Sequence, residues 1–214
     1  MAYQTYPKYI AVTGPIASGK TTLGSKIAEE LGYTFIPEEF EDNPHLAKYN
    51  AGEGGFYEAE MWFLERDFRR HQRAQNILQQ GGGVVLDKPI YQNFAYIDTA
   101  PLTPEERAEC VAILQEQSAT LTKPGLIIDI SADPDLLIAR IAERGREIEK
   151  PIQRDRFVQF AESHKNSLSL WPDTRRLCIV AGSRDYLNDI EAVREVLDLT
   201  RDRDEKDTLD LKDK

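Results

Sequence analysis

The sequence predicts a doubly wound α/β fold, in which a parallel sheet has helices packed on both of its faces. Short apolar runs alternate with longer amphipathic patterns along the 214 residues. The apolar runs are hydrophobic at successive positions, which is typical of strands buried on both faces of a sheet. A glycine-rich motif directly follows the first run and opens a helical pattern. Parallel strands need crossover helices, and the alternating order supplies them.

Five strands and six helices are predicted from these patterns. Each strand is a run of apolar residues, and the strand ranges are 9–13, 34–36, 84–86, 126–130 and 177–180. Each helix has apolar residues at three- and four-residue spacing. The helix ranges are 20–31, 56–80, 104–121, 134–144, 153–170 and 189–199.

Length and composition predict one domain over residues 1–199. The chain is 41% hydrophobic, enough for one buried α/β core, and no Ser-, Gly- or Pro-rich linker divides it. Residues 200–214 are mostly charged and contain only two leucines. Such a segment buries too little apolar surface to fold, so we expect a disordered C-terminal tail.

Charge and the lack of targeting signals narrow the classes of partner. The net charge of −10 disfavours nucleic acid, because binding its backbone requires Lys and Arg to neutralise phosphates. A small phosphorylated ligand is still allowed, since a few local cations are enough for it. No signal-peptide core is found at the N-terminus, and no apolar run is long enough to span a membrane. We expect a soluble, cytoplasmic protein in which Cys110 and Cys178 are buried, reduced thiols.

The motif at residues 14–21 has the G-x-x-x-x-G-K-T pattern of a phosphate-binding loop. In such a loop the backbone N–H groups surround a phosphate chain, and the dipole of the following helix adds to the attraction. Lys20 is expected to reach the β- and γ-phosphates, and Thr21 to place its hydroxyl on Mg²⁺. The alternative is a glycine-rich turn before an ordinary helix. The predicted nucleotide-binding residues here are Gly14, Pro15, Ile16, Ala17, Ser18, Gly19, Lys20, Thr21 and Thr22.

Carboxylates follow the second and third predicted strands. Glu38 comes just after the second strand, at the mouth of the predicted phosphate site, where a carboxylate can accept a proton from an attacking hydroxyl. Asp87 directly follows the third strand, the natural position for a Mg²⁺ ligand in a phosphate-loop protein. A solvated loop acid is the alternative for Glu38, and a helix N-cap or turn former for Asp87.

A group of arginines near residue 144 predicts a lid over the phosphates. Arg140 and Arg144 are four residues apart on one helix face, and Gly145 lets the chain turn so that Arg146 can approach. Phosphoryl transfer spreads negative charge over the moving group, and a planar guanidinium neutralises it with two parallel hydrogen bonds. The alternative is a solvent face in which Glu143, Glu147 and Glu149 form salt bridges with these arginines.

Together these segments resemble the deoxyribonucleoside kinases of the phosphate-loop superfamily. The resemblance covers residues 9–199 and is carried by GPIASGKTT at 14–22, EEFEDNP at 38–44, FLER at 63–66, DKPIY at 87–91 and RIAERGREIE at 140–149. It implies a nucleoside-kinase fold with five parallel strands and an arginine lid. It also implies a homodimer that transfers the γ-phosphate of ATP to the 5′-hydroxyl of a nucleoside.

The resemblance assigns roles by position. Glu38 corresponds to the general base, and Asp87 to the acid that organises Mg²⁺. Glu149 corresponds to the lid carboxylate on the sugar 3′-hydroxyl, with Tyr49 as its partner. The remaining matches are Arg140, Arg144 and Arg146 on the phosphates, Arg66 at the nucleobase, and Arg184, Asp185 and Tyr186 around the adenine of ATP. Apart from the resemblance, the aromatic residues Trp62 and Phe63 are candidates to stack on the base; the alternative, which is the more common one on a long amphipathic helix, is that they belong to the core.

Three positions depart from the family's pattern. Lys88 stands where the family has an arginine near the 5′-oxygen. Ala59, seven residues before Arg66 and flanked by Glu58 and Glu60, stands where a glutamine pairs with the base, and Asn93 where an acid often faces it. The EEFEDNP segment and the compact length resemble bacterial kinases of purine deoxynucleosides, so we favour deoxyadenosine or deoxyguanosine.

Two other functions are compatible with a phosphate loop. A nucleoside monophosphate kinase needs extra cations for its phosphorylated acceptor; Lys88 is one candidate, but no arginine cluster follows the second strand. A non-catalytic nucleotide-binding subunit of a larger assembly would explain the altered base site. The intact loop, together with Glu38, Asp87 and the arginines, argues against this second alternative.

Overall fold

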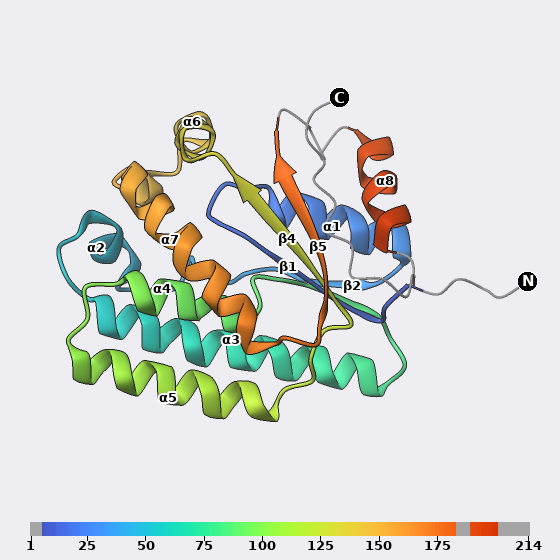
Figure 1. Ribbon diagram of the computed structural model, residues 1–214, viewed down its shortest axis with the longest axis horizontal. Coiled ribbons are helices and arrows are strands. Elements are labelled where there is room, and N and C mark those ends of the chain that lie inside the picture. The colour runs from blue at the N-terminus through green and yellow to red at the C-terminus, as the bar shows by residue number, and fades with distance from the viewer. Residues whose placement is uncertain (1–5, 183–188, 201–214) are drawn as a thin grey trace, which may run out of the picture.

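The protein is a five-stranded parallel sheet with helices on both faces (Figure 1). This computed structural model describes residues 6–182 and 189–200. The strands are β1 (Tyr9–Thr13), β2 (Thr34–Ile36), β3 (Val84–Asp87), β4 (Leu126–Ala132) and β5 (Arg175–Ala181), and they lie in the order β2-β3-β1-β4-β5. The doubly wound, five-stranded parallel sheet expected from the sequence is therefore confirmed.

The central strand β1 explains why the sheet is buried on both faces. Ile10 pairs with Val85 of β3 on one side and with Leu126 of β4 on the other. Ile10 and Val12 pack against residues of α1 (Lys20–Leu31) and α8 (Ile190–Thr200). Ala11, between them, faces the opposite layer of helices. Because side chains alternate across a strand, a continuous apolar run supplies both layers of the core.

The helices agree with the predicted ranges except for short segments. The other helices are α2 (Leu46–Ala51), α3 (Phe56–Gln79), α4 (Asn93–Thr99), α5 (Pro104–Thr120), α6 (Pro134–Arg144) and α7 (Arg154–Ser167), with 3₁₀ turns η1 (Ile90–Gln92), η2 (Glu147–Glu149) and η3 (Leu168–Leu170). The helix predicted over 153–170 ends at Ser167 and continues as η3. Helices α2 and α4 were not predicted, because neither has a side-chain cap and both are too short to show a helical period.

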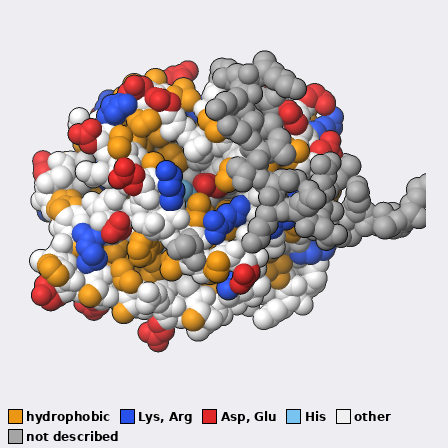
Figure 2. Space-filling view, in the orientation of Figure 1, with side chains coloured by type: hydrophobic (Ala, Val, Ile, Leu, Met, Phe, Trp, Pro, Cys, Tyr) orange, Lys and Arg blue, Asp and Glu red, His pale blue; other side chains and the backbone are white. Residues whose placement is uncertain are grey.

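The helices form two unequal layers. In Figure 1, α1 and α8 lie on one side of the sheet, whereas α3, α5 and α7 cover the other. Helix α5 packs on α3, and α4 packs against α7. Basic side chains are scattered among acidic and apolar ones on the face shown in Figure 2. Across the described ranges, no helix is both long and apolar enough to cross a membrane.

Cys110 is buried in α5, and Cys178 is partly buried in β5; both are free thiols, although Cys178 is less buried than expected. The predicted C-terminal tail, apart from Thr200 at the end of α8, lies outside the described residues.

Candidate active site

A cavity of about 920 Å³ opens beyond the carboxyl ends of the strands. Ligands in open α/β sheets bind at this edge, where the strand order reverses. The cavity is lined by loop residues 16–22, by the segment after β2, and by parts of α2, α3, α4, α6, η2 and α7. It brings together residues that are far apart in the sequence, among them Lys20, Glu38, Tyr49, Arg140 and Glu149.

The phosphate loop has a backbone that only particular residues allow. Gly14 has φ of 138°, and a Cβ there would lie 2.2 Å from the carbonyl oxygen of Ile130. Gly19, the N-cap residue just before α1, has φ of 97°. Ala17 has φ of 63°, one of two non-glycine residues with positive φ in the described chain. Backbone of this kind is costly and is found preferentially at ligand-binding loops.

Two side chains fix this loop to the rest of the protein. Gln92 accepts hydrogen bonds from the Thr13 hydroxyl (2.6 Å) and the Gly14 N–H (3.2 Å), and donates to the Gly14 carbonyl (3.0 Å). The Arg140 guanidinium donates to the carbonyls of Ala17 and Ser18, both at 3.3 Å. Arg140 lines the cavity beside the loop. It therefore braces the loop in addition to placing positive charge there.

Lys20 lies at the base of the cavity with its ammonium group held at the loop. Its Nζ donates to the Pro15 carbonyl at 2.8 Å, and the side chain is buried. Burial lowers the pKa of Lys20, whereas the negative charges of Asp87 and Glu38 act to raise it. A phosphate group bound in the loop would strengthen the charged form further, because it adds negative charge beside the ammonium.

The side-chain oxygens of Thr21 and Asp87 lie side by side near Lys20. The Thr21 hydroxyl donates to Asp87 Oδ2 at 2.5 Å, and Asp87 is fully buried at the end of β3. Asp87 Oδ1 has no hydrogen-bond partner among the described residues. Buried polar atoms almost always have partners, and a hard divalent cation takes oxygen ligands of this kind. The two side chains fit the predicted magnesium position, although Asp87 itself lies behind the cavity wall.

Glu38 is one of several carboxylates that line the cavity, and it is the one beside Lys88. Its side chain is 24% exposed, and its Oε1 lies 3.4 Å from Lys88 Nζ. Lys88 is buried, has φ of 50°, and places its ammonium 4.3 Å from the centre of the Phe63 ring. The cation that replaces the family's arginine therefore contacts the candidate base directly. The Glu38 side chain thus lines the cavity and is paired with Lys88.

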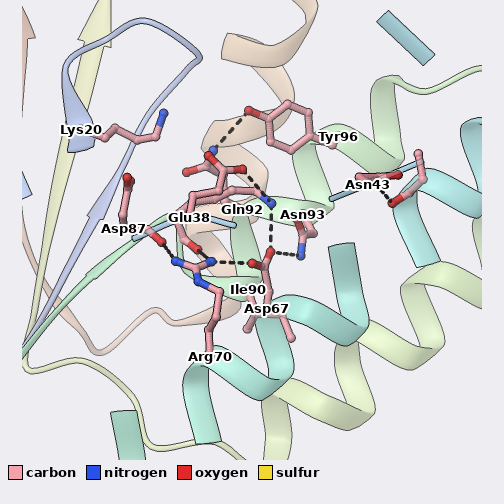
Figure 3. Close-up of polar contacts among 12 residues, drawn as sticks. Lys20, Glu38, Asn43, Asp67, Arg70, Asp87, Ile90, Gln92, Asn93 and Tyr96 are labelled. Carbon is pink, nitrogen blue, oxygen red and sulfur yellow. Dashed lines mark hydrogen bonds and ion pairs between the residues drawn. The ribbon is translucent and has the colours of Figure 1, made fainter. Parts of the chain in front are cut away.

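A buried ionic network lies beneath Lys88 and was not predicted. Asp67 accepts hydrogen bonds from Lys88 Nζ (2.9 Å), Asn93 Nδ2 (2.8 Å) and Arg70. Figure 3 shows Asp67 between Arg70 and Asn93, with Asp87 beyond Arg70. Arg70 also donates to the backbone carbonyls of Asp87 and Lys88, so it holds the end of β3 in place. The network therefore supports both Asp87 and Lys88 from below.

Charge coupling keeps this network ionised. Burial alone would raise the pKa of Asp67, but Lys88 and Arg70 outweigh it and hold that pKa below its usual value. Burial acts to lower the pKa of Lys88, and Asp67 and Glu38 outweigh that effect and raise it. The cation and the carboxylate thus stabilise each other's charged form. The sequence signal for the network was the three-residue spacing of Asp67 and Arg70 on one helix face.

His71, the residue after Arg70 on α3, holds the start of the 3₁₀ turn η1. Its Nε2 accepts a hydrogen bond from the Ile90 N–H at 2.9 Å, and Nδ1 lies 2.9 Å from the Tyr9 hydroxyl. Because Nε2 accepts, the neutral ring carries its proton on Nδ1. Burial, with a smaller contribution from Arg70, lowers the pKa of His71 to about 3. The ring is a neutral structural group near physiological pH.

The lid arginines share one carboxylate. Arg144 and Arg146 both form ion pairs with Glu149, which is buried in η2. The predicted solvent-face alternative is thus partly realised, because the arginines have acidic partners, yet all three side chains line the cavity. Asn50 donates to the Ile148 carbonyl at 2.7 Å and accepts from Arg156 at 2.9 Å, which ties α2 and α7 to this lid.

The residues of α3 that line the cavity are not all those predicted to bind the nucleobase. Ala59 is fully buried and packs with Tyr49 and Ala100. Arg66 points toward acidic side chains, Glu39 at 3.3 Å and Asp42 at 3.7 Å. Ala59, Arg66 and Asn93 are not among the described residues that line the cavity, whereas Glu60 and Phe63 of α3 are.

Of the three residues expected to share the base-binding face of α3, Phe63 lines the cavity, whereas Ala59 and Arg66 do not and Glu60 lies beside Phe63 on the wall. Tyr49, Lys88 and Glu149 line the cavity as expected. The predicted adenine loop, with Arg184, Asp185 and Tyr186, lies outside the described residues.

Comparisons with known proteins show the family of this chain. The family model of deoxynucleoside kinases matches residues 10–202. The deoxyguanosine kinase of Bacillus subtilis (strain 168) is 31% identical over 186 residues, 84% of this chain and 89% of that protein. The deoxyadenosine/deoxycytidine kinase of the same organism is 26% identical, over 88% of this chain and 89% of that protein.

Among solved structures, the deoxyadenosine kinase of M. mycoides with bound dCTP superposes with a TM-score of 0.72 at 17% identity, covering 89% of this chain and 98% of that one. This structural likeness supports the fold, whereas the match to the family model supports the kinase activity. The chain belongs to the deoxynucleoside kinase family.

Proposed function

We propose that this enzyme transfers the γ-phosphate of ATP to the 5′-hydroxyl of a purine deoxynucleoside, giving the 5′-monophosphate and ADP. One observation carries the proposal: the phosphate loop with Lys20 lines the same cavity as Glu38 and Lys88. A phosphate donor bound at the loop and a hydroxyl acceptor beside Glu38 would therefore share one cavity. The predicted roles of the individual residues are part of this proposal.

Glu38 would act as the general base. As its carboxylate accepts the proton of the 5′-hydroxyl, that oxygen forms a bond to the γ-phosphorus, and the bond from the γ-phosphorus to the bridging oxygen of ADP breaks. Lys88, 3.4 Å from Glu38, would orient the carboxylate before the transfer. Lys20 and the guanidinium groups of Arg140, Arg144 and Arg146 would neutralise the charge that spreads over the moving phosphoryl group.

Thr21 and Asp87 would hold Mg²⁺. Their oxygens are 2.5 Å apart, and the free Oδ1 of Asp87 is available to a metal-bound water or to the metal itself. The ion would supply charge neutralisation at the β- and γ-phosphates. Residues 14–22 would bind the phosphates, and Arg184, Asp185 and Tyr186 would surround the adenine of ATP.

Tyr49 and Glu149 would bind the sugar, and the wall formed by Phe63 and Tyr96 would hold the base. These four side chains all line the cavity. A purine is supported by the curated relatives, a deoxyguanosine kinase and a deoxyadenosine/deoxycytidine kinase. We also propose a homodimer in the cytoplasm, as the family resemblance implies. Light scattering of the purified protein, with an expected mass twice the 24.4 kDa of one chain, tests the dimer.

The two alternative functions find less support. A monophosphate kinase would need free cations at the acceptor end, whereas Lys88 is already paired with Asp67 and Glu38. A non-catalytic subunit has no need of a carboxylate at the cavity mouth. A coupled assay of ADP release against the four deoxynucleosides, the ribonucleosides and the monophosphates tests the proposal. Turnover confined to monophosphates, or absent with every acceptor, would overturn it.

A further inference from the structure

We infer that Glu60 selects guanine among the nucleobases, by accepting the N1–H and one N2–H of guanine on its two carboxylate oxygens. The inference rests on the proposed function, because it places a nucleoside in the cavity. It goes further by assigning the base and the residue that reads it. Glu60 lies one position from the predicted base-binding residue of α3.

The Glu60 carboxylate is buried, incompletely bonded and part of the cavity wall. The residue is 1% exposed and lines the cavity. Its Oε1 accepts a hydrogen bond from the Tyr49 hydroxyl at 2.7 Å, and its Oε2 has no partner among the described residues. An unpaired buried oxygen costs free energy, so a ligand that supplies a donor there gains affinity.

The neighbouring side chains make room for a flat aromatic ring beside Glu60. Phe63 is three residues further along the same helix face, and Tyr96 of α4 lines the same cavity. Lys88 also lines the cavity, with its ammonium 4.3 Å from the Phe63 ring centre and 5.6 Å from that of Tyr96. The aromatic rings provide surfaces for stacking, and the carboxylate provides acceptors for the edge of the base.

The hydrogen-bonding edge of guanine is the one that matches a carboxylate. Guanine presents two adjacent donors, N1–H and N2–H. Adenine and cytosine present one donor beside one acceptor, which would place a ring-nitrogen lone pair against a carboxylate oxygen. Thymine has one donor between two acceptors. A site with paired acceptors therefore rejects the bases that cannot supply two donors, because a polar atom is left unpaired.

The protonation state of Glu60 is expected to change which base it prefers. Burial raises the pKa of this carboxyl to about 7, although the hydrogen bond from Tyr49 and the charges of Lys88 and Arg156 lower it. A protonated carboxyl offers one donor and one acceptor, which matches adenine. The preference for guanine over adenine is therefore expected to rise as the pH increases through this range. The other groups that face Glu60 are Asp67 of the same helix, Tyr96 of α4 and Cys110 of α5.

The test compares deoxyguanosine, deoxyinosine and deoxyadenosine as substrates of the unaltered enzyme. Deoxyinosine keeps N1–H but lacks the 2-amino group. We expect kcat/KM for deoxyguanosine to exceed that for deoxyinosine by about tenfold or more, as expected for one lost hydrogen bond in a buried site. We also expect the deoxyguanosine to deoxyadenosine ratio to be higher at pH 8.5 than at pH 6. Equal kcat/KM for deoxyguanosine and deoxyinosine, or a flat ratio with pH, would overturn the inference.

A matched pair of variants makes the test specific to Glu60. Glu60→Gln replaces one acceptor by a donor, so the deoxyguanosine to deoxyadenosine ratio should fall by about tenfold or more. Glu58→Gln, an exposed position on the same helix, should leave the ratio unchanged. Calorimetric titration of the nucleosides measures the same preference without turnover. If no deoxynucleoside is phosphorylated, the proposed function fails, and the titration alone decides the role of Glu60.

Discussion

Substitution of Asp67 by Asn tests the buried network beneath the site. Asp67 is fully buried and receives hydrogen bonds from Lys88, Asn93 and Arg70. Removing one partner of a buried ion pair costs about 3–5 kcal/mol, because the remaining charge is left without compensation. In the variant, Arg70 can still donate to the carbonyls of Asp87 and Lys88, and Lys88 still has the Glu38 carboxylate as a partner, at 3.4 Å in the unaltered protein. We therefore expect the lower end of that range, a loss of about 3 kcal/mol in the free energy of unfolding.

Urea unfolding followed by circular dichroism measures this loss. With a slope of about 2–3 kcal/mol per molar urea, the midpoint should fall by about 1–1.5 M. The control is Glu65→Gln on the same helix, whose ion pair with Arg69 is about two-thirds exposed and should change stability by less than about 0.5 kcal/mol. A second substitution, Lys88→Met in the Asp67→Asn background, removes the stranded cation and should restore part of the loss. If Asp67→Asn costs no more than Glu65→Gln, the network does not support the site.

The remaining predictions concern His71 and Asn50. The folded pKa of His71, about 3, lies below the ordinary value of 6.5, so its contribution to stability is complete above pH 6.5 and is lost as the pH falls toward 3. His71→Gln should therefore cost less stability at pH 4.5 than at pH 7, by up to about 1.4 kcal/mol per pH unit below 6.5, in parallel urea titrations; an equal cost at both pH values would show that the ring is not buried neutral. Asn50→Ala should raise the KM for the nucleoside by about tenfold and leave the KM for ATP unchanged, because it frees the Ile148 carbonyl beside Glu149. Unchanged KM values for both substrates would mean that Asn50 does not position the lid.

The strands and the phosphate loop were predictable because their signals are local. Strand β1, the motif at residues 14–21 and helix α1 follow one another directly, and the structure has β1 and α1 with the predicted bounds. The face of α3 that meets the cavity was not predictable in the same way. Glu60 and Asp67 are seven residues apart and so share one face of α3. Acidic residues on one helix face normally indicate exposure to solvent, yet both are buried.

The burial of these acids depends on partners far along the chain. Tyr49 bonds to Glu60, and Lys88 bonds to Asp67 across 21 residues. A pattern within one helix does not contain that information. The same limit applies to the departure at Lys88, where the chain has a lysine in place of the family's arginine. The sequence shows that an ammonium replaces a guanidinium at this position. Only the structure shows that this ammonium forms an ion pair with the carboxylate of Asp67.

The role of Glu38 is the central claim, and single-turnover kinetics of Glu38→Gln test it most directly. Glutamine keeps the size of the side chain but cannot take the proton, so phosphoryl transfer should slow by about 10²–10⁴-fold while the nucleoside still binds. Glu39→Gln is the matched control, because Glu39 is the adjacent residue and pairs with Arg66. The account predicts a change of less than threefold for Glu39→Gln, about 0.6 kcal/mol in the barrier. A large loss in Glu39→Gln, or transfer at nearly the normal rate in Glu38→Gln, would contradict it.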